Sequence, residues 1–177
     1  MKKHHNIPFL FLMIVLFSQL TSEKKFTVSG QVFLNAEYCM GVRPTEEMIA
    51  ELNTLKAYPN KTFFIKKGKA NLATQKVIGK VKTNPQGKFT IQLPAGTYHL
   101  FDTVQLLTPS AYIKLKGGKD NYELSDSVCY KKWQNKPIAS FTIKNKEVKI
   151  KDINFRIVCY KGDFNCECVD FIGPRVP

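Results

Sequence analysis

The chain has 177 residues, and its 27 lysines and arginines outnumber 14 acidic residues, which gives a formal net charge of +13. This length fits one domain. Such a charge can attract lipopolysaccharide, an anionic glycan or nucleic acid. The basic residues never form a run of five, however, which argues against a specific nucleic-acid-binding segment and favours a lysine-rich, solvated surface.

The first residues have the pattern of a secretory signal peptide, which we assign to residues 1–22. A basic start precedes an almost wholly apolar run from Ile7 to Phe17. This run is shorter than the roughly 20 residues that cross a bilayer, so we predict cleavage near Ser22, with an uncleaved anchor as the alternative. Removing 22 residues, Lys2 and Lys3 among them, leaves 155 residues and a net charge of +11. No transmembrane segment is expected in this part, and we expect it in the periplasm or outside the cell.

The folded domain is predicted to cover residues 23–158 and to begin with a strand. Alternate positions of this strand are small or apolar, and they give it one inward face: Phe26, Val28, Gly30, Val32 and Leu34. A short helix is predicted from Thr45 to Asn53, because Thr45 suits an N-cap and two glutamates follow it. A second strand is predicted from Lys61 to Lys67, with Phe63 and Ile65 inward.

The centre of the domain, Val77 to Asp102, is predicted to contain three short strands and two turns. The inward side chains of the three strands are predicted to be Val77, Gly79 and Val81, then Phe89, Ile91 and Leu93, then Tyr98 and Leu100. Asn-Pro-Gln-Gly and Pro-Ala-Gly supply the residues that turns need. His99 is predicted to point away from the apolar face.

This central segment, V-x-T-N-x-x-G-x-F-x-I-x-L-P-x-G-x-Y, resembles the middle of the carboxypeptidase regulatory-like domains, which are transthyretin-like (prealbumin-like) β-sandwiches of secreted bacterial proteins. The matching residues are Gly87, Phe89, Leu93, Pro94, Gly96 and Tyr98. Phe26 to Val32 resembles the opening strand of that family, and Ile150 to Ile157 resembles the closing one. The resemblance implies an all-β, Greek-key sandwich of about seven strands with one or two short inserted helices. It implies no activity, because such sandwiches host many roles.

After Thr103 the periodicity is weak, and two short elements are predicted. Ala111 to Leu115 is predicted to be a short strand, followed by a turn at Gly117-Gly118. Ser125 to Ser127 is predicted to cap a short helix that carries Cys129 and Trp133.

The domain is predicted to close with two further strands. Phe141 to Ile143 is predicted to be a strand, and Asn145-Lys146 a hairpin turn. The inward register then shifts between Ile150 and Ile153, which predicts a bulge at Lys151-Asp152.

The second insertion is rich in aromatic and basic residues, and two interpretations of it stay open. It is either a ligand-binding face, whose rings stack on sugars or bases, or a hydrophobic cluster under a long loop. The residues of this candidate ligand face are Tyr112, Tyr122, Tyr130, Trp133, Lys131 and Lys132.

Residues 159–177 form a cysteine-bearing tail that is expected to be packed on the sandwich. Disulfides are the default state of cysteines in an exported chain, and an odd number leaves one over. A bridge across one residue is geometrically unfavourable. We therefore predict two disulfides that join the inserted loops to the tail: Cys39 with Cys166 or Cys168, and Cys129 with Cys159 or the remaining tail cysteine. The five candidates are Cys39, Cys129, Cys159, Cys166 and Cys168.

A soft-metal site is the alternative use of the cysteines. Four thiolates could bind Cu(I) or Zn(II): Cys39, Cys159, Cys166 and Cys168. Against this interpretation stand the oxidising compartment and the lack of a paired C-x-x-C. The preferred prediction therefore includes no metal and no cofactor.

No catalytic motif is present in the sequence. G-x-S-x-G, H-E-x-x-H and a phosphate-cradling glycine loop are all missing. One transthyretin-like branch hydrolyses 5-hydroxyisourate with clustered histidines and ends in Tyr-Arg-Gly-Ser. After signal cleavage this chain keeps only His99, and it ends in Arg-Val-Pro. We therefore predict no catalytic residues and no enzyme activity.

Two functional hypotheses follow. The first is an exported, monomeric, non-enzymatic β-sandwich with a structural or binding role at the cell envelope, its partner an unidentified envelope protein or glycan. The second is an exported metal- or redox-handling protein that uses the cysteines of the tail.

Overall fold

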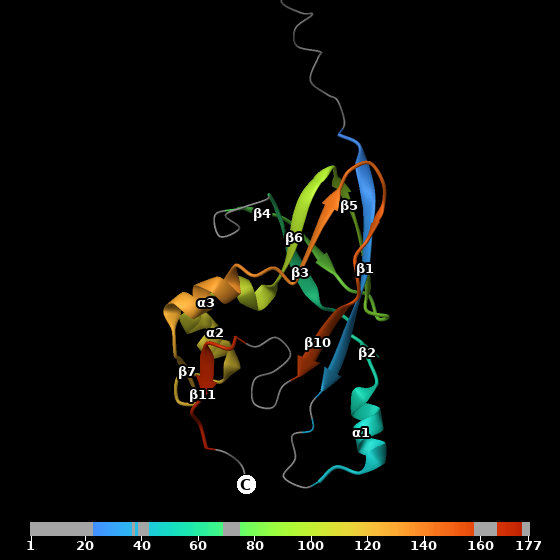
Figure 1. The fold of residues 1–177 in the computed structure, drawn as a ribbon. Coiled ribbons are helices and arrows are strands. Elements are labelled where there is room, and N and C mark those ends of the chain that lie inside the picture. The colour runs from blue at the N-terminus through green and yellow to red at the C-terminus, as the bar shows by residue number, and fades with distance from the viewer. Residues whose placement is uncertain (1–22, 37, 39–42, 69–74, 158–165, 175–177) are drawn as a thin grey trace, which may run out of the picture.

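A computed structural model describes residues 23–36, 38, 43–68, 75–157 and 166–174, and it shows two β-sheets packed as a sandwich (Figure 1). In the first sheet, β1 (Lys25–Ala36) pairs with four strands: β5 (Lys88–Pro94), β2 (Lys56–Ala57), β9 (Val148–Lys149) and β10 (Ile153–Ile157). The second sheet has the order β4 (Val77–Lys82), β3 (Thr62–Lys67), β6 (Gly96–Asp102) and β8 (Ala139–Ile143). The predicted β-sandwich with short helices is confirmed.

The core between the sheets comes from the alternating apolar positions of the strands. Val28, Val32, Phe63 and Ile65 are fully buried, and Phe89 is nearly so. Phe63 lies at the centre, with ring centroids 6.0 Å from Phe89 and 6.1 Å from Phe155. The predicted inward faces of β1, β3, β5 and β6 therefore meet in one continuous core.

Strand β4 departs from its predicted pattern. Only Val81 is buried, whereas Val77 and Ile78 are both exposed. The pairing with β3 explains this, because the register slips at a bulge between Ile65 and Lys66. Strict alternation fails beyond such a bulge. The prediction of Val77 as an inward residue is wrong for this reason.

The turn before β5 has the predicted chemistry. The Asn84 side chain accepts hydrogen bonds from the backbone amides of Gln86 and Lys88. Gly87 has φ +71°, and a Cβ at this position would lie 2.4 Å from the carbonyl oxygen of Val32. Glycine is thus required both by the backbone conformation and by the close approach of β1.

The closing strands run parallel to β1. Val28 is paired with Val148 and Val32 with Ile153, so the five residues 28–32 of β1 lie opposite six residues, 148–153. This extra residue is the bulge that the register shift predicts. The prediction of a hairpin at Asn145-Lys146 is wrong, because β8 pairs in the second sheet and β9 in the first. The turn therefore carries the chain from one sheet to the other.

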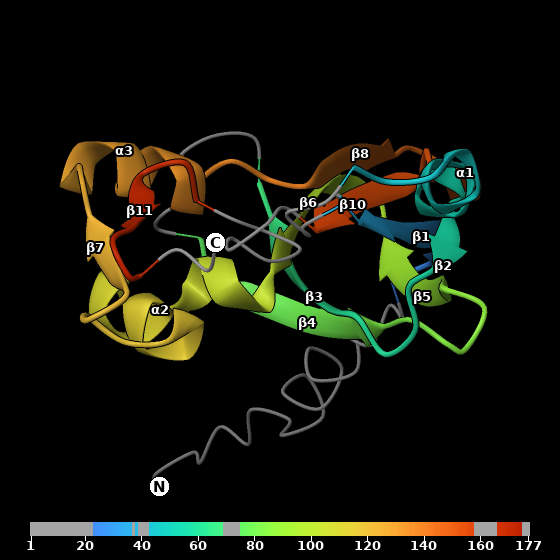
Figure 2. The same ribbon diagram turned by 90° about the horizontal axis from the view of Figure 1, so that it is seen from below.

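The second insertion and the described part of the tail form a lobe beside the sandwich (Figure 2). We name this the insert lobe; its elements are the 3-10 helix η2 (Thr103–Leu106), α2 (Pro109–Lys116), β7 (Tyr122–Leu124), α3 (Ser127–Gln134) and β11 (Val169–Phe171). Strand β11 pairs antiparallel with β7. The described part of the tail thus packs on this lobe.

Helix α2 replaces the strand predicted at Ala111 to Leu115. The Thr108 side chain accepts from the Ala111 amide, and Pro109 occupies the first turn. Gly117, at φ +135°, ends the helix. These are strong helix-boundary signals, and they outweigh the β-branched character of Ile113.

Helix α1 (Glu46–Asn53) agrees with its prediction, since the Thr45 side chain accepts from the Met48 amide as an N-cap. None of its residues is buried. Within the described residues, no helix has the length and apolar character needed to cross a membrane.

Candidate functional site

A buried glutamine joins the insert lobe to the sandwich. The Gln105 side-chain oxygen accepts from the Asp102 amide at 2.9 Å. Its nitrogen donates to the carbonyl oxygens of Trp133 at 2.9 Å and of Lys136 at 2.8 Å. Gln105 is only 2% exposed, so these bonds form away from solvent. They fix the C-terminal end of α3 against the end of β6.

The same junction holds a buried ion pair. The Lys61 amine lies 2.6 Å from the Asp102 carboxylate, which is fully buried. The second carboxylate oxygen accepts from the Thr103 hydroxyl and the Val104 amide. The Lys61 amine also lies 4.6 Å from the ring centroid of Phe155. Both charges are thus engaged inside the protein, which indicates a structural role.

The residues of the predicted ligand face differ in burial: some lie in the core of the insert lobe, and others lie at its surface. Tyr112 and Tyr130 are buried, with ring centroids 5.8 Å apart, and they form the centre of the insert lobe. Burial, with a smaller contribution from the nearby Cys166, raises the pKa of Tyr130 to about 12. Tyr122 packs against Phe171 instead. The Trp133 ring also packs on this pair, with its centroid 5.3 Å from that of Tyr112 and 5.3 Å from that of Tyr130. All four rings match the interpretation as a hydrophobic cluster.

A disulfide between Cys129 and Cys168 joins α3 to the tail. This bond agrees with the prediction that Cys129, in the second insertion, pairs with a cysteine of the tail. Cys166 is buried beside it, and its backbone amide donates to the Tyr112 hydroxyl. Cys39 and Cys159, the other two candidates, lie outside the described residues.

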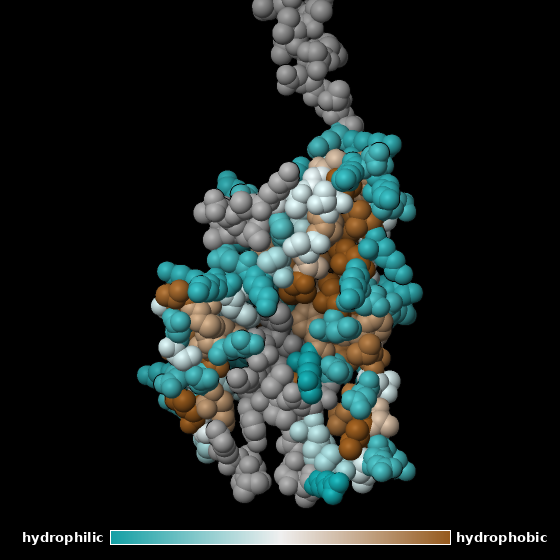
Figure 3. Space-filling view, viewed as in Figure 1, coloured by the Kyte–Doolittle hydropathy of each residue, from teal (hydrophilic) through white to brown (hydrophobic). Residues whose placement is uncertain are grey.

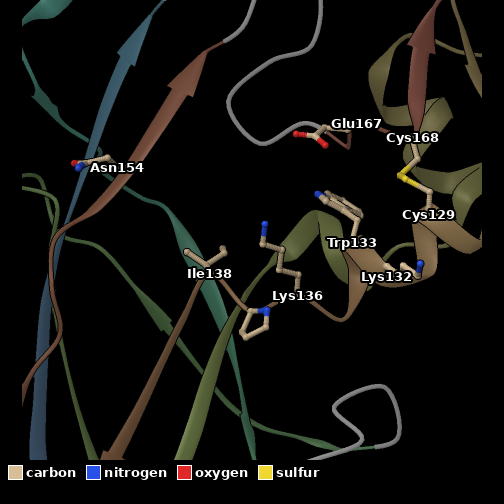
Figure 4. Close-up of a pocket in the computed structure, with 9 residues that line it drawn as sticks. Cys129, Lys132, Trp133, Lys136, Ile138, Asn154, Glu167 and Cys168 are labelled. Atoms are coloured by element: carbon tan, nitrogen blue, oxygen red, sulfur yellow. A yellow bond between two sulfur atoms is a disulfide. The ribbon is translucent and has the colours of Figure 1, made fainter.

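Trp133 lines a cavity of about 500 Å³ between the insert lobe and the sandwich. Figure 4 shows its ring between the Lys136 side chain and the disulfide, with Glu167 across from it. The cavity is lined by residues of α3, of the connection to β8, of β10 and of the tail: Cys129, Lys132, Trp133, Lys136, Pro137, Ile138, Asn154, Glu167 and Cys168. The site therefore combines one aromatic ring, two amines, a carboxylate and an amide.

No contact that the structure describes uses the charged groups of this cavity. Lys132, Lys136 and Glu167 are all exposed. Within the described residues, none of their side chains takes part in a hydrogen bond or an ion pair. Their charges are consequently available to a ligand. Lys131, the other predicted lysine, is exposed but does not line the cavity.

A second hollow of about 440 Å³ continues from the first along the side of the sandwich. It lies between β8 on one sheet and β9 and β10 on the other, and both hollows share Ile138 and Asn154. Figure 3 shows apolar surface on this side of the sandwich with hydrophilic residues around it. Lys149, Lys151 and Asp152 also line this hollow.

The four-thiolate metal set loses a member when the disulfide forms. Cys168 is bonded to Cys129 and has no thiolate to offer in this state. The parts of the chain that the structure describes contain no group of three side chains able to hold a metal ion. His99 is 7% exposed, and its ring nitrogens lie 2.8 Å from Ser140 Oγ and from the Gly68 carbonyl oxygen. It ties β6 to β8 and to the end of β3.

Sequence reasoning identified part of the cavity and missed the rest. Trp133 and Lys132 belong to the predicted ligand face, and they do line the cavity. Lys136, Asn154 and Glu167 were not singled out, because they come from separate elements and form no motif. Their only signal was the basic, aromatic character of the neighbouring helix.

Comparison with known proteins adds structural likeness only. The sequence matches no protein-family model and no protein of curated function. The shaft pilin SpaA from Lactobacillus rhamnosus GG has a TM-score of 0.40 at 12% identity, over 75% of this chain and 51% of the pilin. The Bacillus anthracis TIE protein has a TM-score of 0.36 at 18% identity, over 74% of this chain and 17% of that one.

A DUF3823 family protein from Parabacteroides merdae has a TM-score of 0.32 at 13% identity, over 73% of this chain and 46% of that protein. The chain thus spans about half the length of the pilin and less of the other two proteins. Similarity this weak carries no argument about family or function. The β-sandwich itself is established by the strand pairing described above.

Proposed function

We propose that this protein is an exported, non-enzymatic β-sandwich module that binds a saccharide of the cell envelope in the cavity beside Trp133. The observation that carries the proposal is the lining of that cavity. An indole ring stands there beside amine, carboxylate and amide groups, and the charged ones have no partner within the described residues.

The chemistry of the lining suits a sugar. The flat, apolar face of an indole packs against the C–H face of a sugar ring, as aromatic side chains do in sites that are apolar at one end and polar at the other. The Lys136 amine donates hydrogen bonds, the Glu167 carboxylate accepts them, and the Asn154 amide does both. Sugar hydroxyls need both kinds of partner. A few polar groups around an apolar surface is the usual composition of a ligand site.

Export is supported by two independent features. Residues 1–22 have the composition of a signal peptide. The Cys129–Cys168 bridge would persist in the periplasm or outside the cell, whereas cytosolic reductants remove such bonds.

Binding is favoured over cleavage by the number of carboxylates. Glycoside hydrolysis usually needs two carboxyl groups on either side of the scissile bond. Glu167 is the one carboxylate among the described residues that line the Trp133 cavity. The metal- or redox-handling alternative is less well supported, because Cys168 is already bonded to Cys129.

The test is calorimetric titration of the exported protein with a panel of envelope saccharides. Glu167→Gln and Trp133→Ala should each weaken binding about tenfold or more, since each removes a direct contact. Lys131→Gln is the matched control, because Lys131 lies on the same helix and outside the cavity. Glu167 is exposed, so its variant keeps the fold even if loss of the Trp133 ring loosens the lobe. Unchanged affinity in Glu167→Gln and Trp133→Ala, or no saccharide bound, would overturn the proposal.

A further inference from the structure

The two hollows adjoin on the side of the sandwich, and together we name them the groove. They share Ile138, at the start of β8, and Asn154, on β10. From there the second hollow follows the chain back to Val148. Val148 and Asn154 are paired with Val28 and Phe33, and these five steps of β1 at roughly 3.3 Å each span about 17 Å. This length is added to the Trp133 cavity, so the whole is longer than a single sugar requires.

The described lining of the groove is basic at both of its ends. Lys132 and Lys136 lie at the Trp133 end, and Lys149 and Lys151 lie at the other end. All four are exposed, and within the described residues none of their side chains has an ion-pair or hydrogen-bond partner. The described carboxylates of the lining are Glu167 and Asp152. Amines therefore outnumber carboxylates at each end of the groove.

We propose that this groove binds an extended acidic polysaccharide, with one sugar on Trp133 and the carboxylates of following sugars beside Lys149 and Lys151. The inference rests on the proposed function, and it adds the charge of the ligand and its length. Lysine amines recognise carboxylates as point charges without fixed orientation. Such contacts suit a chain whose units repeat along an open groove. Linked units also gain affinity because the second contact becomes intramolecular.

A saccharide explains the lining better than other polyanions do. A phosphate polymer would use the amines and leave the Trp133 ring and the apolar surface of Ile138 and Val148 without a role. An acidic sugar chain has C–H faces for the apolar surface and carboxylates for the amines. The combination of both surfaces in one groove therefore points to an acidic glycan.

The experiment uses galacturonate oligomers of two and eight units as probes, titrated into the full exported protein. Trp133 is the only tryptophan, so its fluorescence reports occupancy of the cavity, with calorimetry as the second readout. The octamer should bind about tenfold more tightly than the dimer. The double variant Lys149→Gln/Lys151→Gln should weaken octamer binding roughly three- to tenfold and leave dimer binding unchanged.

The matched control is Lys80→Gln/Lys82→Gln, which makes the same change of charge on exposed lysines of β4, at the opposite edge of the second sheet. This control should bind the octamer like the parent protein at a stated salt concentration. A fall equal to that of the groove variant would mean that net charge alone decides binding, and it would overturn the inference.

The remaining outcomes separate this inference from the proposed function. Equal affinity for dimer and octamer, with binding still weakened in Trp133→Ala, would overturn the groove and leave the saccharide cavity in place. Maltooctaose binding as tightly as the octamer would overturn the acidic ligand. Inorganic polyphosphate binding as tightly, without a change in Trp133 emission, would overturn the glycan. Failure of every saccharide to bind would overturn both proposals.

Discussion

The sandwich and the insert lobe are stabilised in different ways. The sandwich buries side chains from both sheets, with Phe63 at the centre of its core. The insert lobe has a small core around Tyr112 and Tyr130, and it adds a disulfide and the Gln105 hydrogen bonds. A small unit buries too little apolar surface to hold itself together, so it needs such cross-links. The side of the cavity that carries Trp133, Glu167 and the disulfide thus belongs to the region held by specific bonds, whereas Asn154 on the other side belongs to the sandwich.

The largest effect is expected in the sandwich core. Phe89 is 3% exposed, and its ring lies directly over Gly30, where a Cβ would approach it to 2.5 Å. Phe89→Ala should therefore lower the free energy of unfolding by about 3–5 kcal/mol, as for other buried aromatic residues. Lys88→Ala, on the solvent side of the same strand, should cost no more than about 0.5 kcal/mol. Equal urea midpoints for the two variants would contradict the strand register.

An intermediate effect is expected at the joint between the two regions. Gln105→Leu removes the partners of the Trp133 and Lys136 carbonyl oxygens and of the Asp102 amide. Unsatisfied buried groups cost about 1–3 kcal/mol each, partly relieved by water that enters. The thermal midpoint should fall and saccharide binding should weaken, because α3 carries Trp133. Gln86→Leu, in an exposed turn, is the control. Equal thermal midpoints for the two variants would contradict the role of Gln105 in holding the insert lobe on the sandwich.

The smallest expected effect is a loss of folding stability at alkaline pH, caused by Tyr130 in the insert lobe. The pKa of Tyr130 is raised to about 12 by burial. Between the usual tyrosine pKa near 10 and this value, the unfolded chain releases a proton that the folded chain keeps. Stability should thus be complete below about pH 10 and decline toward pH 12. Urea titrations at pH 8 and pH 11 should show a smaller decline in Tyr130→Phe than in Tyr122→Phe, and equal declines would refute this account.

The same contrast explains what the sequence could and could not predict. Alternation identified the inward faces of β1, β3 and β5, because a sheet with one buried face enforces a period of two. The insert lobe lacks such a period. The sequence pattern predicts Ala111 to Leu115 as a strand from its apolar residues and Gly117-Gly118 as a turn, without the helix start that Thr108-Pro109 provides. Local caps decided the structure there.

The pairing of strands that are distant in the sequence could not be predicted either. The bulge before Ile153 was visible as a register shift, but nothing local shows that β9 and β10 run parallel to β1. The groove depends on that pairing, because it places Asn154 near Trp133 and Glu167. The disulfide partner of Cys129 was limited to tail cysteines, and the choice of Cys168 required the fold.

Hydrogen exchange before and after reduction of the Cys129–Cys168 bridge tests the central claim most directly. The bridge closes a loop across 39 positions, and in the chain-entropy model it contributes about 4 kcal/mol. Mild reduction should therefore speed exchange in α2, α3 and β11 by at least tenfold, leave β1, β3 and β6 protected, and weaken saccharide binding. Exchange that rises equally in both regions, or in neither, would contradict the claim that the lobe side of the cavity, with Trp133 and Glu167, is held separately from the sandwich.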